Sequence, residues 1–383
     1  MKSSAVFIAL AAAGLMAGCA SGNAAGSNST ETAANAENAS IPAPKAALEV
    51  VKKISDECKS PIVQMVTKQD GSHHYLLADA TLWQASDDGS VKFIKKLDDS
   101  TDNYKLIPSD GVIIHYTNDK IMLVHVESDT ELFRLAGDPK LKTVLFSPNN
   151  LEMATRESDN VFNVWNVPKR FSGIQISETV QDFINRQSPD NKLRFSVDAY
   201  AVSLTNEGRV ILAADDVANN KIGLIYFMDD KNAKGTLKAI GRTNSHIGHL
   251  AIALSGNNIA AVDETGQLYV SSTGEDKGFK IYAKKYNDLI NVKFVGEDVL
   301  AIAKDKLTRI DIATGAVKWT YDISPKTCYA PNSGKILCST GNTIEDINGE
   351  TGALNRVYFF TSQNYGVVEG GELKGSMPES CYK

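Results

Sequence analysis

The sequence predicts an all-β domain assembled from repeated units of short strands, and three observations carry this prediction. From about residue 59 onward, short β-like runs are separated by Gly, Asn and Asp turns. Helical periodicity is nearly absent, and residues 46–55 and 180–186 are the only plausible helical pieces. Similar units recur at close to the roughly 40–45 residues of a four-stranded unit. Because 43% of the residues are hydrophobic, the chain can bury a sizeable core.

The beginning of the chain predicts export. Lys2 is followed by an apolar run over residues 5–16, which is too short to cross a hydrocarbon layer of roughly 30 Å. This pattern is typical of a secretory signal peptide, here over residues 1–18. The run ends in Leu15-Met16-Ala17-Gly18-Cys19, which resembles the lipobox of bacterial lipoproteins, with Met16 where leucine is commonest. The resemblance implies that Cys19 is acylated and becomes the new N-terminus.

Residues 19–45 are expected to be a flexible, lipid-anchored linker. Between Ala20 and Lys45 the chain has no aromatic residue and one β-branched aliphatic residue, Ile41. Such a stretch cannot bury enough apolar area to offset its ordering entropy. By resemblance to lipoprotein sorting signals, Ala20 after the cysteine implies an outer-membrane protein that faces the periplasm.

The body of the chain contains a unit, residues 140–167, that resembles a WD-repeat blade. Phe146-Ser147-Pro148-Asn149-Asn150 matches that family's turn between its first two strands. Asp159 and Trp165 occupy the positions of its structural aspartate and tryptophan, although Asn166 replaces the final aspartate. The resemblance implies scaffold roles for Asp159, in a tight turn, and for Trp165, between neighbouring blades.

A second kind of unit lies near the C-terminus. Residues 307–319 resemble the repeat of quinoprotein-type propellers, in which an aspartate begins a turn, Thr-Gly completes it and a tryptophan docks on the next blade. Asp311, Gly315 and Trp319 take these places. Residues 346–352 repeat the turn with an insertion, and Asp346 is expected to begin it.

Together, these units predict a single β-propeller over residues 46–383, with seven four-stranded blades, or eight if the long fourth unit contains two. The expected blades span residues 60–100, 101–137, 138–175, 176–242, 243–285, 286–323 and 324–360. Two ways of closing the ring remain open: a closing strand from residues 361–383, or pairing through residues 61–66.

If Cys19 carries lipid, four cysteines remain in an exported chain, an even number that predicts two disulfides. Four cysteines allow three pairings. Cys328 with Cys338 is favoured because residues 329–334 between them read as a hairpin turn. Cys58 would then pair with Cys381 and join the two ends of the domain. Buried free thiols are the alternative.

The sequence contains few signs of a catalytic, cofactor-binding or metal-binding site. No Walker loop, Gly-x-Ser-x-Gly elbow or His-Glu-x-x-His motif is present. His246 and His249 begin the fifth unit, and the resemblance to WD blades implies a scaffold role for a histidine there. No catalytic residue, cofactor site or metal site is therefore predicted. A net charge of −6, with dispersed Lys and Arg, argues against nucleic acid as a partner.

Anchor and fold together predict a non-catalytic scaffold that binds envelope proteins. In its architecture the chain resembles the lipid-anchored propeller of the outer-membrane-protein assembly machinery, which implies a role in assembling or organising envelope complexes. The alternative is a periplasmic enzyme, or a receptor that binds a small ligand or metal in the central channel. A channel lined by converging carboxylates and histidines would favour this alternative.

Overall fold

Nearly every described element of the chain is a β-strand. The computed structural model describes residues 45–382 apart from gaps between residues 68 and 333, the longest of which covers residues 176–192. The chain divides into two units, residues 1–37 and 38–383, and all described residues belong to the second. Besides strands, that unit contains the helix α1 (Lys45–Lys52) and two short 3₁₀ helices, η1 (Asp56–Cys58) and η5 (Glu379–Cys381).

The described strands form seven antiparallel sheets of consecutive strands. The first holds β1 (Ile62–Thr67), β2 (His73–Ala78), β3 (Thr81–Ser86) and β4 (Val91–Lys96). The second holds β5 (Tyr104–Leu106), β6 (Val112–Thr117), β7 (Lys120–His125) and β8 (Glu131–Ala136). The third holds β9 (Thr143–Phe146), β10 (Glu152–Arg156), β11 (Phe162–Asn166) and β12 (Ser172–Gln175).

The fourth sheet holds β13 (Leu193–Phe195), β14 (Val202–Leu204), β15 (Val210–Asp216), β16 (Ile222–Asp229) and β17 (Thr236–Arg242). The fifth holds β18 (Ile247–Ile252), β19 (Asn258–Asp263), β20 (Gln267–Ser272) and β21 (Lys280–Lys285). The sixth holds β22 (Leu289–Val295), β23 (Asp298–Ala303), β24 (Lys306–Ile310) and β25 (Val317–Asp322). The seventh holds β26 (Thr327–Asn332), β27 (Lys335–Ser339), β28 (Ile344–Asn348), β29 (Leu354–Phe360), β30 (Tyr365–Glu369) and β31 (Glu372–Gly375).

Two sheets are larger than the four strands that we expected. In the fourth sheet, β13 and β14 pair with different parts of β15, which makes five strands. In the seventh sheet, β30 and β31 continue the ladder beyond β29, which makes six. Residues 361–383 therefore do not supply a strand to the first sheet; they extend the outer side of the last one.

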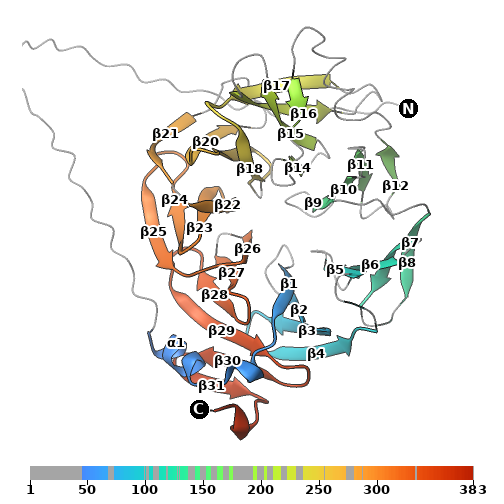
Figure 1. Cartoon of the computed structure of the whole chain (residues 1–383), viewed down its shortest axis with the longest axis vertical. Helices are drawn as coiled ribbons and strands as arrows, with labels where there is room; N and C mark the ends of the chain where they lie inside the picture. Colours follow the sequence, from blue (N-terminus) through green and yellow to red (C-terminus); the bar gives the residue numbers. More distant parts are fainter. Residues whose placement is uncertain are drawn as a thin grey trace, which may run out of the picture. The chain divides into compact units, whose positions relative to one another are not determined.

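The sheets are arranged as a β-propeller, and their first strands surround the centre of the ring (Figure 1). β1 contacts β5 on one side and β26 on the other. Contacts continue from β26 to β22, from β22 to β18, from β18 to β14 and from β14 to β9. The first and last sheets therefore meet directly through β1 and β26.

The apolar faces of neighbouring sheets pack against each other, which buries surfaces that one sheet alone would leave in water. One core cluster joins the sixth and seventh sheets and includes Trp319 and Phe359. A second joins the seventh and first sheets and includes Phe360 and Trp83. Two further clusters join the first sheet to the second and the fifth to the sixth.

Aspartate or asparagine organises the tight turns of the C-terminal sheets. The carboxylate of Asp311 accepts hydrogen bonds from the backbone and hydroxyl of Thr314, both at 2.8 Å, and these bonds lower its pKa to about 2. Gly315 completes this turn at φ 76°, a conformation that glycine adopts without strain. In the next sheet, the side chain of Asn348 takes the same place. The expectation that Asp346 begins that turn is wrong, because Asp346 lies within β28.

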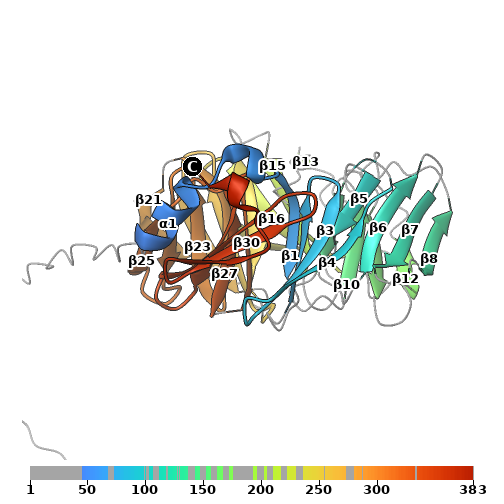
Figure 2. The same cartoon turned by 90° about the horizontal axis from the view of Figure 1, so that it is seen from below.

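The two ends of the described chain lie together beside the last sheet. The helix expected near residues 46–55 is present as α1, which contacts β29, β30 and β31. Figure 2 shows α1 and the C-terminal end side by side, next to β30. The other expected helical piece, residues 180–186, lies outside the described residues.

Candidate partner-binding surface at the ring-closing seam

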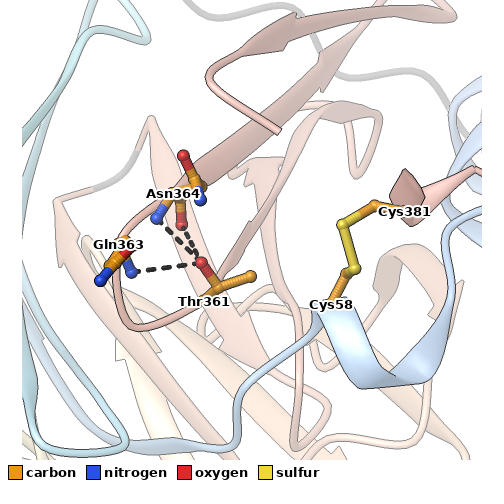
Figure 3. The surroundings of a disulfide bond; sticks show 5 residues. All are labelled: Cys58, Thr361, Gln363, Asn364 and Cys381. Carbon is orange, nitrogen blue, oxygen red and sulfur yellow. Dashed lines mark hydrogen bonds between the residues drawn. A yellow bond between two sulfur atoms is a disulfide. The ribbon is translucent and has the colours of Figure 1, made fainter. Parts of the chain in front are cut away.

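We call the contact between the first and seventh sheets, with the chain ends that cover it, the seam. Both chain ends are joined there by the disulfide between Cys58 and Cys381, whose Cα atoms are 5.7 Å apart (Figure 3). The amide of Ser55 donates to the carbonyl of Cys381 at 2.8 Å, and Ile54 forms a β-bridge with Tyr382. The ends of the ring are therefore held by one covalent bond and by backbone pairing.

Backbone hydrogen bonds continue this closure toward the centre. The amide of Ser60 donates to the carbonyl of Phe360 at 2.7 Å, and the amide of Ile62 donates to the carbonyl of Gly341 at 2.6 Å. Because both donors lie on the segment that enters β1, they fix the first sheet against the last. Of the two ways of closing the ring, the structure shows contact through residues 61–66.

A capped loop between β29 and β30 lies beside the disulfide (Figure 3). The hydroxyl of Thr361 accepts hydrogen bonds from the amides of Asn364, at 2.8 Å, and Gln363, at 3.2 Å. The amide of Thr361 donates in turn to the carbonyl of Asn364 at 2.8 Å. These hydrogen bonds pair the backbone amides of the loop with acceptors inside the loop, and they fix its conformation.

An aromatic cluster lies across the seam, and one of its members is exposed. Trp83 is buried, and its indole N–H donates to the hydroxyl of Thr81 at 2.9 Å. Its ring contacts Phe360 and Tyr365 of the seventh sheet, with centroid distances of 5.4 and 6.1 Å. On its other side, Phe93 makes an edge-to-face contact at 5.1 Å. Phe93 remains 46% exposed, so a buried platform supports an apolar ring at the surface.

Phe93 lies on β4, the edge strand of the first sheet, in a basic segment. Lys92, Lys95 and Lys96 occupy the same six-residue strand, and no acidic residue does. Lysines on an edge strand discourage uncontrolled strand pairing. In the ladder Phe93 lies opposite Trp83 and Lys96 lies opposite Thr81, so Lys96 shares the face of the exposed ring, where its charge complements a partner with a carboxylate.

A charged network also crosses the seam. Arg356 of the seventh sheet donates to the carbonyl of Asp87 in the first at 2.9 Å, and to Glu369 at 3.0 Å. Lys335 forms ion pairs with Asp87 and, at 3.7 Å, with Asp346. Burial raises the pKa of Asp346, while nearby Lys335 acts in the opposite direction. These pairs align the two sheets through specific contacts.

The sixth and seventh sheets are joined by a tryptophan and an arginine. The indole of Trp319 donates to the carbonyl of Gly349 at 2.9 Å, and a Cβ at Gly352 would lie 2.8 Å from the Trp319 ring. Arg309 donates to the same carbonyl at 2.5 Å and to Asp298 at 2.7 Å. Trp319 thus docks on the turn of the next sheet, and this joint is a scaffold feature.

The structure brings some of the predicted residues together and leaves others outside its described part. Cys328 and Cys338 lie opposite each other on β26 and β27 and are bonded. Trp165 lies on β11, where Met153 is its partner across the ladder. Asp159 and Cys19 lie outside the described residues.

Histidines and acids do not gather into a metal site within the described part of the chain, where no group of three or more His, Cys, Asp or Glu side chains could hold an ion. His249 lies on β18, just after a bulge in the ladder, and His246 precedes that strand. In the same described part, no helix has the length and apolar character needed to cross a bilayer.

Sequence reasoning missed the residues that define the seam surface. Phe93 lies in a short strand-like segment that does not differ from the other predicted strands of the chain. Only the topology shows that this strand lies at the edge of its sheet. Arg356 gave no local signal either, since its partner Asp87 is 269 residues away in the chain.

Comparison with known proteins supports the fold. No family model matches the chain, and neither does any curated protein. Among solved structures, the complex of KlAtg21 with the coiled-coil of AgAtg16 has a TM-score of 0.54 at 13% identity, covering 79% of this chain and 100% of that one. Hsv2 of Kluyveromyces marxianus has a TM-score of 0.52 at 11% identity, covering 83% and 100%. Hsv2 of Kluyveromyces lactis has a TM-score of 0.51 at 9% identity, covering 77% and 97%. At such low identity this likeness shows the β-propeller fold alone.

Proposed function

We propose that this protein is a lipid-anchored, non-catalytic platform that binds a protein partner in the bacterial cell envelope. The observation that carries the proposal is the exposed Phe93 ring, which the buried Trp83 supports on an edge strand. Aromatic anchors of this kind dominate the binding energy of protein interfaces. Lys96, on the same face of β4 as Phe93, favours a partner surface that pairs an apolar residue with a carboxylate.

The rigidity of the seam supports this role. A disulfide, an aromatic cluster and a charged network all cross it or cover it. A surface that is ordered before binding loses less conformational entropy when the partner arrives. The fold is also compatible with partner binding, since one of the similar propellers was solved in complex with a coiled-coil.

The anchor belongs to the proposal as well. Acylation of Cys19 would hold the protein at the outer membrane, on its periplasmic side, through the linker over residues 19–45. The linker ends where α1 begins, and α1 packs on the last sheet. The tether would therefore reach the domain from the side of the seam.

Site-specific photocrosslinking in intact cells tests the binding surface. A photoreactive amino acid in place of Phe93 is expected to give a discrete adduct with a protein of the envelope. The matched control is the same amino acid in place of Val63, which is 41% exposed but lies on β1 at the centre of the ring. An adduct at position 63 alone, or none at position 93 in a folded protein, would contradict the proposal.

Truncating the same side chain provides a quantitative test. Phe93→Ala is expected to weaken capture of the crosslinked partner about 30-fold, which corresponds to the roughly 2 kcal/mol of a hot-spot residue. Val63→Ala should leave the affinity unchanged. Thermal unfolding of both variants checks that the fold is kept. Unchanged capture by Phe93→Ala would remove Phe93 from the interface.

A receptor for a small ligand at the ring centre is the second candidate. The central strand β18 carries His249, but within the described part of the chain no group of three or more His, Cys, Asp or Glu side chains could hold a metal ion.

A further inference from the structure

Among the described strands, the first and last sheets share none. Each sheet is built from strands that follow one another in the chain, from β1–β4 in the first to β26–β31 in the last. No described strand from one end of the chain therefore completes a sheet that belongs to the other end. Closure of the ring depends instead on contacts between separate sheets and on the chain ends that lie across them.

The N-terminal segment over residues 45–60, which we call the strap, is bound to the last sheet before it enters the first. Its helix α1 contacts β29, β30 and β31. Ala47 and Ile54 are buried in the core cluster of the sixth and seventh sheets. Further along, the amide of Ser60 donates to the carbonyl of Phe360 at 2.7 Å. The strap therefore links the first sheet to the last without being part of either.

One covalent bond locks the strap in place (Figure 3). Cys58 lies just before β1 and Cys381 just after β31, so their disulfide ties the start of the first sheet to the end of the last. While this bond is intact, the two sheets cannot move far apart, because only short chain segments join them to the disulfide.

The seam has a more polar joint than the neighbouring pair of sheets. Trp319 packs on the turn at Gly352, where a Cβ would lie 2.8 Å from the ring. Arg356 holds the equivalent place at the seam, since each residue stands just after the bulge in the fourth strand of its sheet. Arg356 donates to the carbonyl of Asp87 at 2.9 Å, and a Cβ at Gly89 would lie 2.8 Å from its Nη1 atom.

This substitution of arginine for tryptophan makes the outer part of the seam sensitive to solvent. Of the acids around Arg356, Asp346 is buried, whereas the side chains of Asp87 and Glu369 are 65% and 37% exposed. Water and salt screen exposed charges and weaken their attraction. We therefore expect the outer part of the seam to open more readily than the joint that Trp319 holds.

The two disulfides differ in how easily a reductant can reach them. Cys58 is half-buried and its neighbours in η1 are exposed, while Cys381 is buried. Cys328 and Cys338 are both buried, at 2% and 0% exposure. Thiol–disulfide exchange requires a thiolate to reach one of the two sulfur atoms. A reductant should therefore attack the sulfur of Cys58 before it reaches the other disulfide.

We propose that the Cys58–Cys381 disulfide is a redox latch, whose reduction releases the strap and lets the ring open at the seam. A dithiol supplies the two electrons. One of its thiolates attacks the Cys58 sulfur, and Cys381 leaves as a thiolate that takes up a proton. The second thiol of the reductant, after losing its proton, displaces the Cys58 sulfur, which is protonated in turn, and the reductant becomes a disulfide.

The latch would also control the support of Phe93. The ring of Trp83 contacts Phe360 and Tyr365 of the seventh sheet, and these contacts cross the seam. Opening of the seam breaks them and leaves Phe93 supported from the first sheet alone. The latch itself does not depend on a partner, so it can be tested on the isolated chain, and its failure would leave the proposed function untouched.

Titration of the detergent-purified full chain with dithiothreitol, under conditions that keep the fold, tests the proposal. Free thiols are trapped by alkylation and located by mass spectrometry. Cys58 and Cys381 should become free at a lower reductant concentration than Cys328 and Cys338. Hydrogen–deuterium exchange of the same samples should then be about 10-fold faster or more in residues 45–67 and 361–382. The fifth sheet should keep its exchange rate.

Paired variants separate the latch from a general effect of disulfide loss. Cys58→Ala with Cys381→Ala should show the faster exchange of the strap without any reductant. Cys328→Ala with Cys338→Ala is the matched control and should keep the slow exchange. Thermal unfolding checks that both variants fold, and if either does not, the titration of the parent protein decides alone.

Three results would overturn the proposal. The first is reduction of Cys328–Cys338 before or together with Cys58–Cys381. The second is selective reduction that leaves the exchange of the strap unchanged, because the bond would then be a passive cross-link. The third is faster exchange in all sheets, which would mean that the domain unfolds as a whole instead of opening at the seam.

Discussion

Glu345 and Tyr321 form a buried polar pair in the joint between the sixth and seventh sheets. The Tyr321 hydroxyl donates to Glu345 at 2.5 Å, and both side chains are buried. Burial raises the pKa of Glu345 above the usual 4.5, while the hydrogen bond from Tyr321 acts in the opposite direction. The folded protein therefore holds a proton on this carboxyl more tightly than the unfolded chain does.

This shift predicts the sign of a pH effect on stability. Between pH 4.5 and the raised pKa, the folded state binds more protons than the unfolded state, so the free energy of unfolding falls as pH rises. Glu345→Gln keeps a hydrogen-bond acceptor for Tyr321 but cannot ionise. We expect this variant to lose that part of the pH dependence and to gain stability at neutral pH, by about 1.4 kcal/mol for each pKa unit.

Urea unfolding at several pH values between 4 and 8 measures this effect. Glu372→Gln, at an exposed position on β31, serves as the control and should follow the parent protein. A Glu345→Gln variant with unchanged pH dependence would show that burial does not perturb this carboxyl.

At the scale of elements, the two disulfides close very different loops. Cys58–Cys381 spans 323 residues and links η1 to η5, whereas Cys328–Cys338 spans 10 residues within one hairpin. A cross-link restricts the unfolded chain more when its loop is longer. The first bond therefore acts on the whole ring and the second on two strands.

Replacing each pair by alanine should separate these contributions. Chain-entropy estimates give a loss of about 6 kcal/mol for Cys58→Ala with Cys381→Ala, and about 3 kcal/mol for Cys328→Ala with Cys338→Ala. Urea unfolding of the two double variants provides the comparison. A larger loss for the short loop would mean that packing around the buried Cys328 and Cys338 outweighs chain entropy.

How well the sequence predicted these elements depends on how local their signals are. The all-β class and the four-stranded repeat follow from turn chemistry, as at Asp311 and Gly315, which residues close in the chain determine. β30 and β31 escaped prediction because their place depends on the free outer edge of β29. The role of Phe93 can be inferred only once the topology assigns its strand, β4, to the edge of the first sheet.

At the scale of the whole molecule, the proposed anchor and the ring have separate tasks. The composition of residues 20–44 predicts a flexible chain, whose average end-to-end distance would be about 25–30 Å. A tether of this length would leave the domain free to turn near the membrane. It would also raise the effective concentration of any partner that resides in the same membrane.

Removing the anchor tests this division of tasks. A variant with Cys19→Ala and an ordinary cleavable signal peptide is expected to move from the membrane fraction to the soluble periplasmic fraction, because the propeller has no other proposed attachment. Its thermal unfolding and its Cys58–Cys381 bond should match those of the parent. Fractionation and mass spectrometry of the mature N-terminus measure the change.

Crosslinking of the Cys19→Ala variant through position 93 should fall if the partner resides in the membrane, because the local concentration of such a partner depends on the tether. It should persist if the partner is soluble. A Cys19→Ala protein that stays in the membrane fraction would show that attachment does not depend on acylation of this cysteine.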